Sequence, residues 1–168
     1  LGFETGLSAV ANVASLMQLG KWFDYMRENG VYDNTRIILV ADHGRGLYLN
    51  WDRVIDNGPD TDFFFPLLMV KDFNAKGFSF SDTFMTTADV PTLATSGLID
   101  NPTNPFTGNA INANAKYDRP FYAFMSYDWD TSKNNGNQFF PGTWYRVDNQ
   151  NARDKRNWVM VGENTVLP

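Results

Sequence analysis

The first strong pattern along the chain is helical. Between residues 7 and 29, polar side chains such as Gln18, Lys21 and Arg27 alternate with apolar ones at intervals of three or four. This spacing predicts an amphipathic helix, and Gly30 is placed to end it. The apolar positions are Val10, Val13, Leu16, Met17, Trp22, Phe23 and Met26.

A short apolar run follows the predicted helix. Residues 32–35 have the composition of a turn, and residues 37–41 contain no polar side chain. Such a run is typical of a strand that is covered on both faces. A helix, a turn and a buried strand in this order favour an α/β layer fold.

A second strand and a second helix are predicted further on. Residues 63–70 are rich in apolar side chains, but Pro66 cannot donate to a sheet, so the first half of this segment is expected to be loop. Thr86 or Thr87 can cap a short helix, and Gly97 offers its C-terminal stop. Asp89, in the first turn of that helix, is interpreted as structural.

The last third of the chain reads as loops and short strands. Residues 101–109 are dense in turn formers and predict a loop. Strands are expected at 121–127, 143–147 and 157–161, the last two paired, and residues 131–137 form a polar break.

The break is too short to require a domain boundary. We therefore expect residues 1–168 to belong to one domain, with an α/β portion at 1–130 and a β-hairpin tail at 138–168. The 43% hydrophobic and 15% aromatic content is enough for a sizeable core.

Composition also excludes several classes of protein. The net charge of -5 and the pI near 4.7, with scattered basic residues, argue against nucleic acid as a partner. The absence of cysteine excludes disulfides and thiolate metal sites. No apolar run is long enough to span a bilayer, and the first residue is not Met, so we expect a piece of a longer protein whose membrane anchor, if any, lies in other segments.

The chemistry is concentrated where the first predicted strand ends, at Asp42, His43 and Gly44. The carboxyl edge of a sheet is where open α/β folds form their sites. Carboxylate and imidazole suit zinc or manganese, with calcium as a further possibility. Neighbouring residues of a regular strand face opposite sides, so the two side chains converge only if the strand ends before them. The alternative is that both residues simply end the strand, the carboxylate capping the next turn.

Residues 32–44, Tyr-Asp-Asn-Thr-Arg-Ile-Ile-Leu-Val-Ala-Asp-His-Gly, resemble the "DNT, apolar strand, DHG" signature of sulfatases and their relatives in the alkaline phosphatase superfamily. Those relatives include phosphoethanolamine and phosphoglycerol transferases. Three further segments resemble the family's motifs in the same order: 65–70 its "vPLlv" strand, 87–93 its "DvxPTL" helix, and 104–108 its glycine-bearing loop. The resemblance covers about residues 7–112.

The resemblance implies a fold, a metal and a reaction. The fold would be part of an alkaline-phosphatase-like three-layer sandwich with a small C-terminal β-hairpin. Asp42 and His43 would bind the catalytic metal, and the Asp-His pair is similar to the transferase branch, which uses zinc or manganese. The reaction would pass through a covalent sulfo- or phospho-enzyme, with the metal activating the nucleophile.

The part of the family that carries the nucleophile has no counterpart in this sequence. The chain has no Cys and no Ser-x-Pro-x-Arg motif, so it resembles the C-terminal part of the catalytic domain and we assign it no catalytic residue. The implied partners are the rest of the parent chain and an anionic ester, such as a sulfated glycan or a lipid headgroup. The implied location is extracytoplasmic: periplasmic, extracellular or membrane-anchored.

Several other residues carry weaker signals. Arg45 can contact an anionic substrate, because guanidinium matches sulfate and phosphate geometry, or can be an ordinary exposed arginine. Four acidic residues do not fit an EF-hand and are interpreted as a solvated loop; they are Asp52, Asp56, Asp60 and Asp62.

Two groups of aromatic residues are interpreted as core packing, with a lipid or sugar contact as the alternative. The first group is Phe63, Phe64 and Phe65, with Tyr48 and Trp51 nearby, and the second is Phe139, Phe140, Trp144, Tyr145 and Trp158.

Two hypotheses from other classes stay open. The parent protein can be a non-catalytic binding module that keeps the fold without the chemistry, in which case the nucleophile and the other acidic ligands would be missing upstream. Alternatively, the 168 residues are a complete protein, and the exposed sheet edges would then cause self-association.

Overall fold

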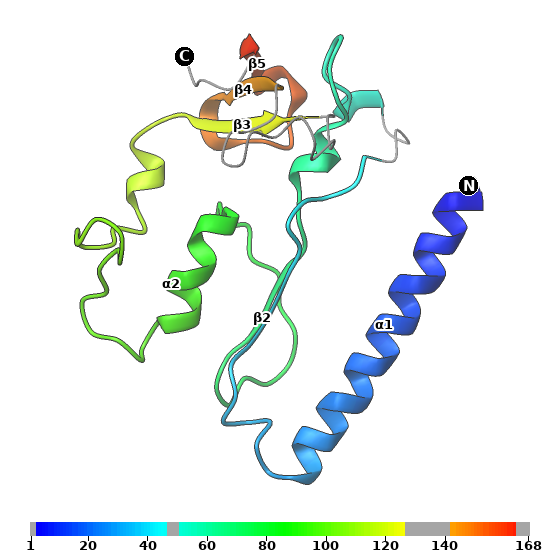
Figure 1. Cartoon of the computed structure of the whole chain (residues 1–168), viewed down its shortest axis with the longest axis vertical. Helices are drawn as coiled ribbons and strands as arrows, with labels where there is room; N and C mark the ends of the chain where they lie inside the picture. Colours follow the sequence, from blue (N-terminus) through cyan, green and yellow to red (C-terminus); the bar gives the residue numbers. More distant parts are fainter. Residues whose placement is uncertain (1–2, 47–50, 127–141, 164–168) are drawn as a thin grey trace, which may run out of the picture. The chain divides into compact units, whose positions relative to one another are not determined.

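A computed structural model of the chain describes residues 3–46, 51–126 and 142–163. These residues form a mixed α/β structure with helices, 3-10 turns, one two-stranded sheet and one three-stranded sheet (Figure 1). The chain divides into two compact units, Leu1–Leu39 with Met69–Ser81 and Val40–Leu68 with Asp82–Pro168. The predicted α/β class is confirmed at this level. Tyr48, the polar break at 131–137, Phe139 and Phe140 lie outside the described residues.

The predicted N-terminal helix is present as α1, Phe3–Glu28, and ends where Gly30 was expected to end it (Figure 1). Gly30 has a φ of 68°, in the left-handed region that glycine adopts without strain. The N–H of Val31 donates to the carbonyl of Met26 at 3.0 Å, and the N–H of Gly30 donates to that of Arg27 at 3.0 Å. These bonds satisfy carbonyls that the helix end would otherwise leave unpaired.

The apolar face predicted for α1 is exposed for most of its length. Met26 is 5% exposed, whereas Leu16 is 57% and Met17 62% exposed. Residues 5–20 contain no charged side chain, so this part of α1 has no strongly polar face either. The contacts described for α1 lie near its C-terminal end, where the Phe23 ring lies 5.8 Å from the Tyr32 ring and the Met26 carbonyl accepts from the Val31 N–H.

Strand β1, Ile37–Val40, pairs with β2, Leu68–Lys71. Backbone hydrogen bonds flank the pair on both sides, from Asn74 to Asp33 at 2.8 Å and from Ala41 to Leu67 at 3.0 Å, and show that the strands are antiparallel. β1 was expected to be covered on both faces, but Val40 is exposed, because this sheet has only two strands among the described residues. The loop predicted before Pro66 is confirmed.

The turn before β1 is braced by Lys71, the last residue of β2. The Lys71 ammonium donates to the carbonyl of Thr35 at 2.9 Å and to that of Tyr32, and it lies 4.4 Å from the centre of the Tyr32 ring. The Arg27 guanidinium lies 4.2 Å from the same ring. Arg36 pairs with Asp72 at 2.9 Å. Residues 32–36 therefore have a structural role.

The short helix predicted after Thr86 is present as a 3-10 turn, Thr87–Asp89, followed by α2, Val90–Thr95. The Asp89 carboxylate accepts a hydrogen bond from the Thr86 N–H at 2.7 Å and pairs with Lys116 at 3.0 Å. Burial raises the pKa of Asp89, but the Thr86 N–H and the Lys116 ammonium outweigh it, and the net shift is downward. The structural interpretation of Asp89 is therefore confirmed.

The C-terminal strands form one antiparallel sheet in the order β3-β4-β5 (Figure 1). The strands are β3, Phe121–Met125, β4, Thr143–Val147, and β5, Trp158–Glu163. All three were predicted, but the tail is not a simple hairpin, because β3 joins it as a third strand. The core of this unit lies against the sheet and consists of Ile55, Ala123, Tyr145, Val147 and Trp158.

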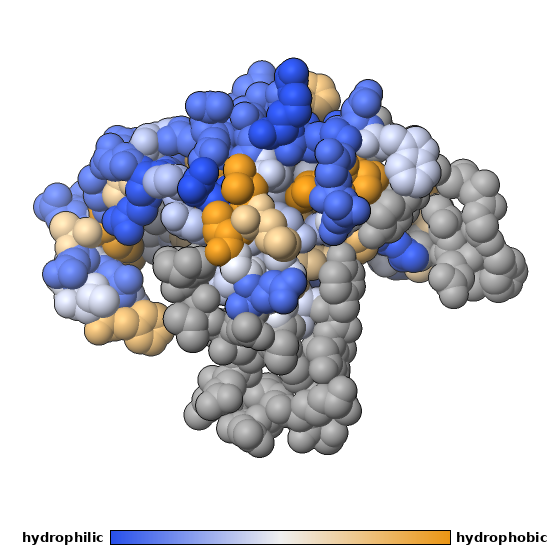
Figure 2. Space-filling view, turned by 90° about the horizontal axis from the view of Figure 1, so that it is seen from above, coloured by the Kyte–Doolittle hydropathy of each residue, from blue (hydrophilic) through white to orange (hydrophobic). Residues whose placement is uncertain are grey.

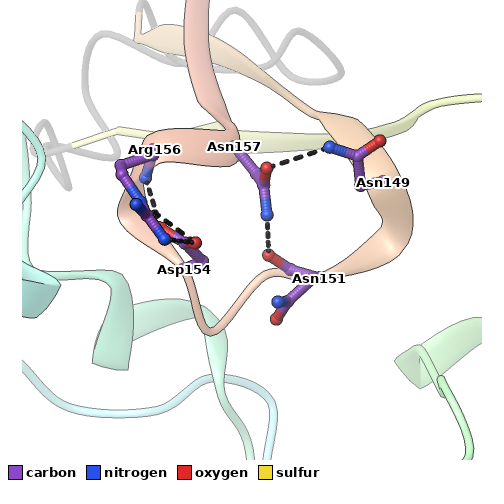
Figure 3. Close-up of polar contacts among 5 residues, drawn as sticks. All are labelled: Asn149, Asn151, Asp154, Arg156 and Asn157. Carbon is purple, nitrogen blue, oxygen red and sulfur yellow. Dashed lines mark hydrogen bonds and ion pairs between the residues drawn. The ribbon is translucent and has the colours of Figure 1, made fainter.

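A polar network holds the connection between β4 and β5 (Figure 3). The Asn157 amide donates to the carbonyl of Asn151 at 2.9 Å and accepts from the Asn149 amide at 3.2 Å. Asp154 accepts hydrogen bonds from the guanidinium of Arg156 at 2.6 Å and from its N–H at 3.0 Å. These bonds lower the pKa of Asp154 to about 2.

The surface is not uniformly polar. On the face drawn in Figure 2, apolar side chains are visible among polar and charged ones. Within the described part of the chain, no helix is long and apolar enough to cross a membrane.

Two methionines of α1 give a matched test of its burial. Met26→Ala is expected to lower the free energy of unfolding by about 2 to 4 kcal/mol, because it leaves a cavity at a buried site. Met17→Ala, at an exposed site of the same helix, should change it by less than about 0.5 kcal/mol. Urea denaturation of both variants measures the difference. Equal losses would contradict the exposure of this face in the purified chain.

The lowered pKa of Asp154 predicts a pH dependence. A carboxyl with a depressed folded-state pKa adds stability above its unfolded value, near 3.8, and that contribution is lost as pH falls toward about 2. Asp154→Asn should therefore destabilise the chain at pH 5 and have little effect near pH 2. Urea denaturation at both pH values tests this, with Asp24→Asn, whose side chain is 70% exposed, as a control.

Candidate metal centre

Asp42 and His43 lie just past the end of β1, where the backbone bends. The last bond of the β1 to β2 ladder is the one from the Ala41 N–H, so neither residue belongs to the regular strand. The Asp42 carboxylate accepts a hydrogen bond from the His43 N–H at 2.9 Å. The strand therefore ends early enough for the two side chains to lie on one side, as a shared metal requires.

The His43 ring is oriented by a hydrogen bond to its neighbour. Its Nδ1 lies 2.5 Å from the carbonyl oxygen of Gly44. A carbonyl oxygen only accepts, so Nδ1 must carry the proton, and Nε2 of the neutral ring keeps a free lone pair. A histidine that binds a metal commonly donates its other ring N–H to such an acceptor.

The free nitrogen of His43 lies beside the carboxylate of Asp42. His43 Nε2 and Asp42 Oδ2 are 3.9 Å apart, and the two side chains are 62% and 90% exposed. Ligand atoms about 2.0 to 2.2 Å from a tetrahedral zinc stand roughly 3.4 Å from each other. A small side-chain rotation brings the pair to this spacing, so the two residues fit a divalent metal as two of its ligands.

The pair is not a complete site by itself. Among the residues that the structure describes, no group of three His, Cys, Asp or Glu side chains is placed to hold a metal ion. Tetrahedral structural sites use four protein ligands and catalytic sites three. Further ligands would therefore have to come from outside the described residues.

The loop that carries the pair lies against residues 60–65. The Gly44 N–H donates to the Phe63 carbonyl at 2.9 Å. A Cβ on Gly44 would stand 2.0 Å from the Asp62 carbonyl oxygen and 2.6 Å from that of Phe65. The φ of Gly44 is not positive, so the close approach of a second backbone, and not a left-handed turn, is what requires glycine.

Gly46, on the other side of Arg45, also lies close to residues 60–63, but it faces side chains and not backbone. A Cβ there would stand 2.4 Å from the ring of Phe63 and 3.0 Å from the Cβ of Asp60. Arg45 itself is exposed and interacts within the chain. Its assignment as a substrate contact stays a prediction.

The acidic residues after the loop were predicted to be solvated, but they are not uniformly so. Asp60 is 1% exposed, and its carboxylate caps the 3-10 turn Thr61–Phe64 by accepting from the Asp62 N–H at 3.0 Å. Asp62 pairs with Arg53, and Asp56 pairs with Lys155 at 3.3 Å. Sequence reasoning missed this supporting role of residues 60–65. The two glycines at 44 and 46 are the signal that can reveal it.

In comparisons with known proteins, no protein-family model, no curated protein and no solved structure matches the chain. The case for a metal centre therefore rests on the chemistry and geometry of Asp42 and His43.

Two glycines test the close packing of this loop. Gly44→Ala should lower the free energy of unfolding by about 1 to 3 kcal/mol, because the added methyl group meets backbone that cannot rotate away. Gly20→Ala, in open space on α1, should raise it by about 0.5 to 1 kcal/mol. Thermal or urea unfolding measures both, and a neutral Gly44→Ala would contradict the contact.

Proposed function

We propose that the chain is part of a metal-dependent enzyme of the sulfatase kind, in the alkaline phosphatase superfamily, that acts on sulfate or phosphate esters. The observation that carries this proposal is the pairing of Asp42 with His43 Nε2, whose lone pair is left free by the hydrogen bond from Nδ1 to Gly44. A carboxylate and a neutral, oriented imidazole together form a typical pair of zinc or manganese ligands.

The bound metal would act as a Lewis acid on the ester and lower the pKa of the attacking group. The chain's own contribution is to hold two donor atoms in place before the metal arrives. The Gly44 carbonyl fixes the His43 tautomer, and the backbone contact with residues 60–65 fixes the loop. Arg45, exposed two residues after His43, would contact an anionic substrate through its guanidinium.

The rest of the proposal concerns segments outside this chain. The nucleophile and the remaining metal ligands would be supplied by the rest of the parent protein, whose catalytic domain would be a three-layer α/β sandwich. The substrate would be an anionic ester such as a sulfated glycan or a lipid headgroup, met outside the cytoplasm. The resemblance of residues 32–44 to the sulfatase signature supports this assignment.

Transfer of a phosphoryl headgroup is the second candidate, and the imidazole donor favours it. Calcium is bound by oxygen ligands, whereas imidazole suits zinc and manganese. An Asp-His pair therefore agrees better with the zinc- or manganese-using transferases than with calcium-using sulfatases.

The two ligands predict metal binding that depends on both. In calorimetric titrations, the chain should bind zinc weakly, and His43→Ala or Asp42→Asn should reduce the affinity by more than about tenfold, since each removes one of two donors. Asp82→Asn, at an aspartate whose side chain is 94% exposed, is the matched control and should bind as the wild type does.

Turnover tests the reaction itself. In the parent protein, with zinc or manganese present, hydrolysis of an aryl sulfate or aryl phosphate should be lost in both variants and kept in Asp82→Asn. Zinc binding without turnover of either ester would contradict hydrolysis. If no headgroup transfer to an acceptor alcohol is found either, the binding-module hypothesis replaces the enzyme.

A further inference from the structure

Phe64 packs against two aromatic residues of the C-terminal sheet, which also contact each other. Its ring centre lies 4.7 Å from that of Trp158 in β5 and 6.2 Å from that of Tyr145 in β4. Trp158 is 6% and Tyr145 4% exposed, so both rings belong to the core of this unit. Aromatic contacts of this kind are directional, because ring quadrupoles favour tilted and edge-to-face arrangements. These contacts therefore fix the orientation of the Phe64 ring as well as its position.

The two partner rings are themselves fixed. The indole N–H of Trp158 donates to the carbonyl of Ala152 at 2.8 Å, across the β4 to β5 connection that the network around Asn157 holds (Figure 3). The Tyr145 hydroxyl lies close to Gly58, 3.3 Å from where a Cβ on that glycine would stand. Tyr145 thus contacts the same loop on which Phe64 is carried.

Phe64 is one residue away from the atoms that hold the ligand loop. The Phe63 carbonyl accepts from the Gly44 N–H, and the carbonyls of Asp62 and Phe65 lie against Gly44 so closely that no Cβ fits between them. The Gly44 carbonyl in turn orients the His43 ring. A continuous path of contacts therefore leads from Trp158 through Phe64 and Gly44 to His43, with no flexible side chain between Phe64 and the His43 ring.

We propose that Phe64, clamped by Trp158 and Tyr145, is a positioning residue for the Asp42 and His43 donor pair. The C-terminal sheet then acts on the metal centre from a distance by keeping the Gly44 carbonyl where His43 Nδ1 can donate to it. The effect of Phe64 on metal affinity rests on the proposed function. Its effect on the orientation of the His43 ring does not.

The physical reason is the exposure of the pair. His43 is 62% exposed, so the packing of its own side chain does little to orient the ring, and the bond to Gly44 has to compete with water. That bond survives only if the acceptor is held within hydrogen-bond distance. Loosening residues 60–65 would let Gly44 move, and the free imidazole would then exchange between its two tautomers.

The experiment uses His43 as its own reporter, because it is the only histidine in the chain. Nitrogen-15 NMR of the metal-free protein at alkaline pH should show the wild type with its proton on Nδ1. In Phe64→Leu, which stays apolar but loses the ring contacts, the two nitrogen signals should move toward those of a mixed or Nε2-protonated ring. Zinc affinity should fall by about three- to tenfold in the same variant.

Phe124→Leu is the matched control. Phe124 packs on Trp144 with ring centres 4.8 Å apart in the same sheet. It follows the core residue Ala123 in β3, so the two side chains point to opposite faces of the sheet. The variant should leave the His43 signals and the zinc affinity as in the wild type. If Phe64→Leu also leaves both unchanged while near-ultraviolet circular dichroism shows a native fold, the proposal is overturned. An equal change in Phe124→Leu would overturn it too, because the effect would then be general destabilisation.

A second variant covers the case in which Phe64→Leu does not fold. Gly46→Ala keeps the aromatic core but places a methyl group against the Phe63 ring and Asp60, so the same tautomer change is expected. A folded Gly46→Ala with an unchanged ring would contradict the proposal. If the His43 signals of the wild type do not change when zinc is added, the metal centre is contradicted. The comparison of wild type and variants without metal would still decide the positioning role of Phe64.

Discussion

The backbone of Gly44 lies against the backbone of residues 62–65 with no side chain between them, and the larger unit is organised around this contact. The hydrogen bond from Gly44 to Phe63 is 2.9 Å long, and a methyl group on Gly44 would fall 2.0 Å from a carbonyl oxygen. Two loops are thereby fixed to each other. One carries Asp42 and His43, and the other carries Phe64 into the aromatic core. Glycine is needed here for close approach, which is a stricter demand than a turn.

Residues 32–44 contain two segments with different roles. Tyr32 and Thr35 offer carbonyls to Lys71, and Arg36 pairs with Asp72, so the first segment fixes the start of β1 against the end of β2. A partly buried ammonium needs such acceptors, because an unpaired one is costly away from water. Asp42 and His43, at the other end of β1, make hydrogen bonds only 1 residue apart in the sequence among those described, and their side chains are 90% and 62% exposed. A structural role thus accounts for the first segment, and a ligand role fits the second.

Local sequence signals predicted the elements of this chain well, and contacts between distant segments account for what was missed. Gly30 ends α1, Thr86 is the N-cap residue of the 3-10 turn that leads into α2, and the segments at 143–147 and 157–161 are paired strands, because capping, turn chemistry and alternation act over a few residues. The burial of Asp60 depends on Gly46 lying beside it, and the third strand of the C-terminal sheet depends on β3 meeting β4. No local pattern contains such information. Likewise, periodicity predicted which side of α1 is apolar but not what covers it.

The candidate site divides in the same way. Its residue types were readable from the strand that ends in Asp-His-Gly, but the convergence of the two side chains depends on where β1 ends, and the tautomer of His43 depends on the Gly44 carbonyl. The donor pair also has a definite electrostatic consequence. One carboxylate and one neutral imidazole would remove a single unit of charge from a divalent cation, so a metal held by this pair alone would keep a net positive charge and attract anionic groups. In water this attraction is weak, and it strengthens when further groups exclude solvent from the exposed side of the pair. The pair is therefore better suited to a metal site that further ligands complete than to a surface site formed by these two residues alone.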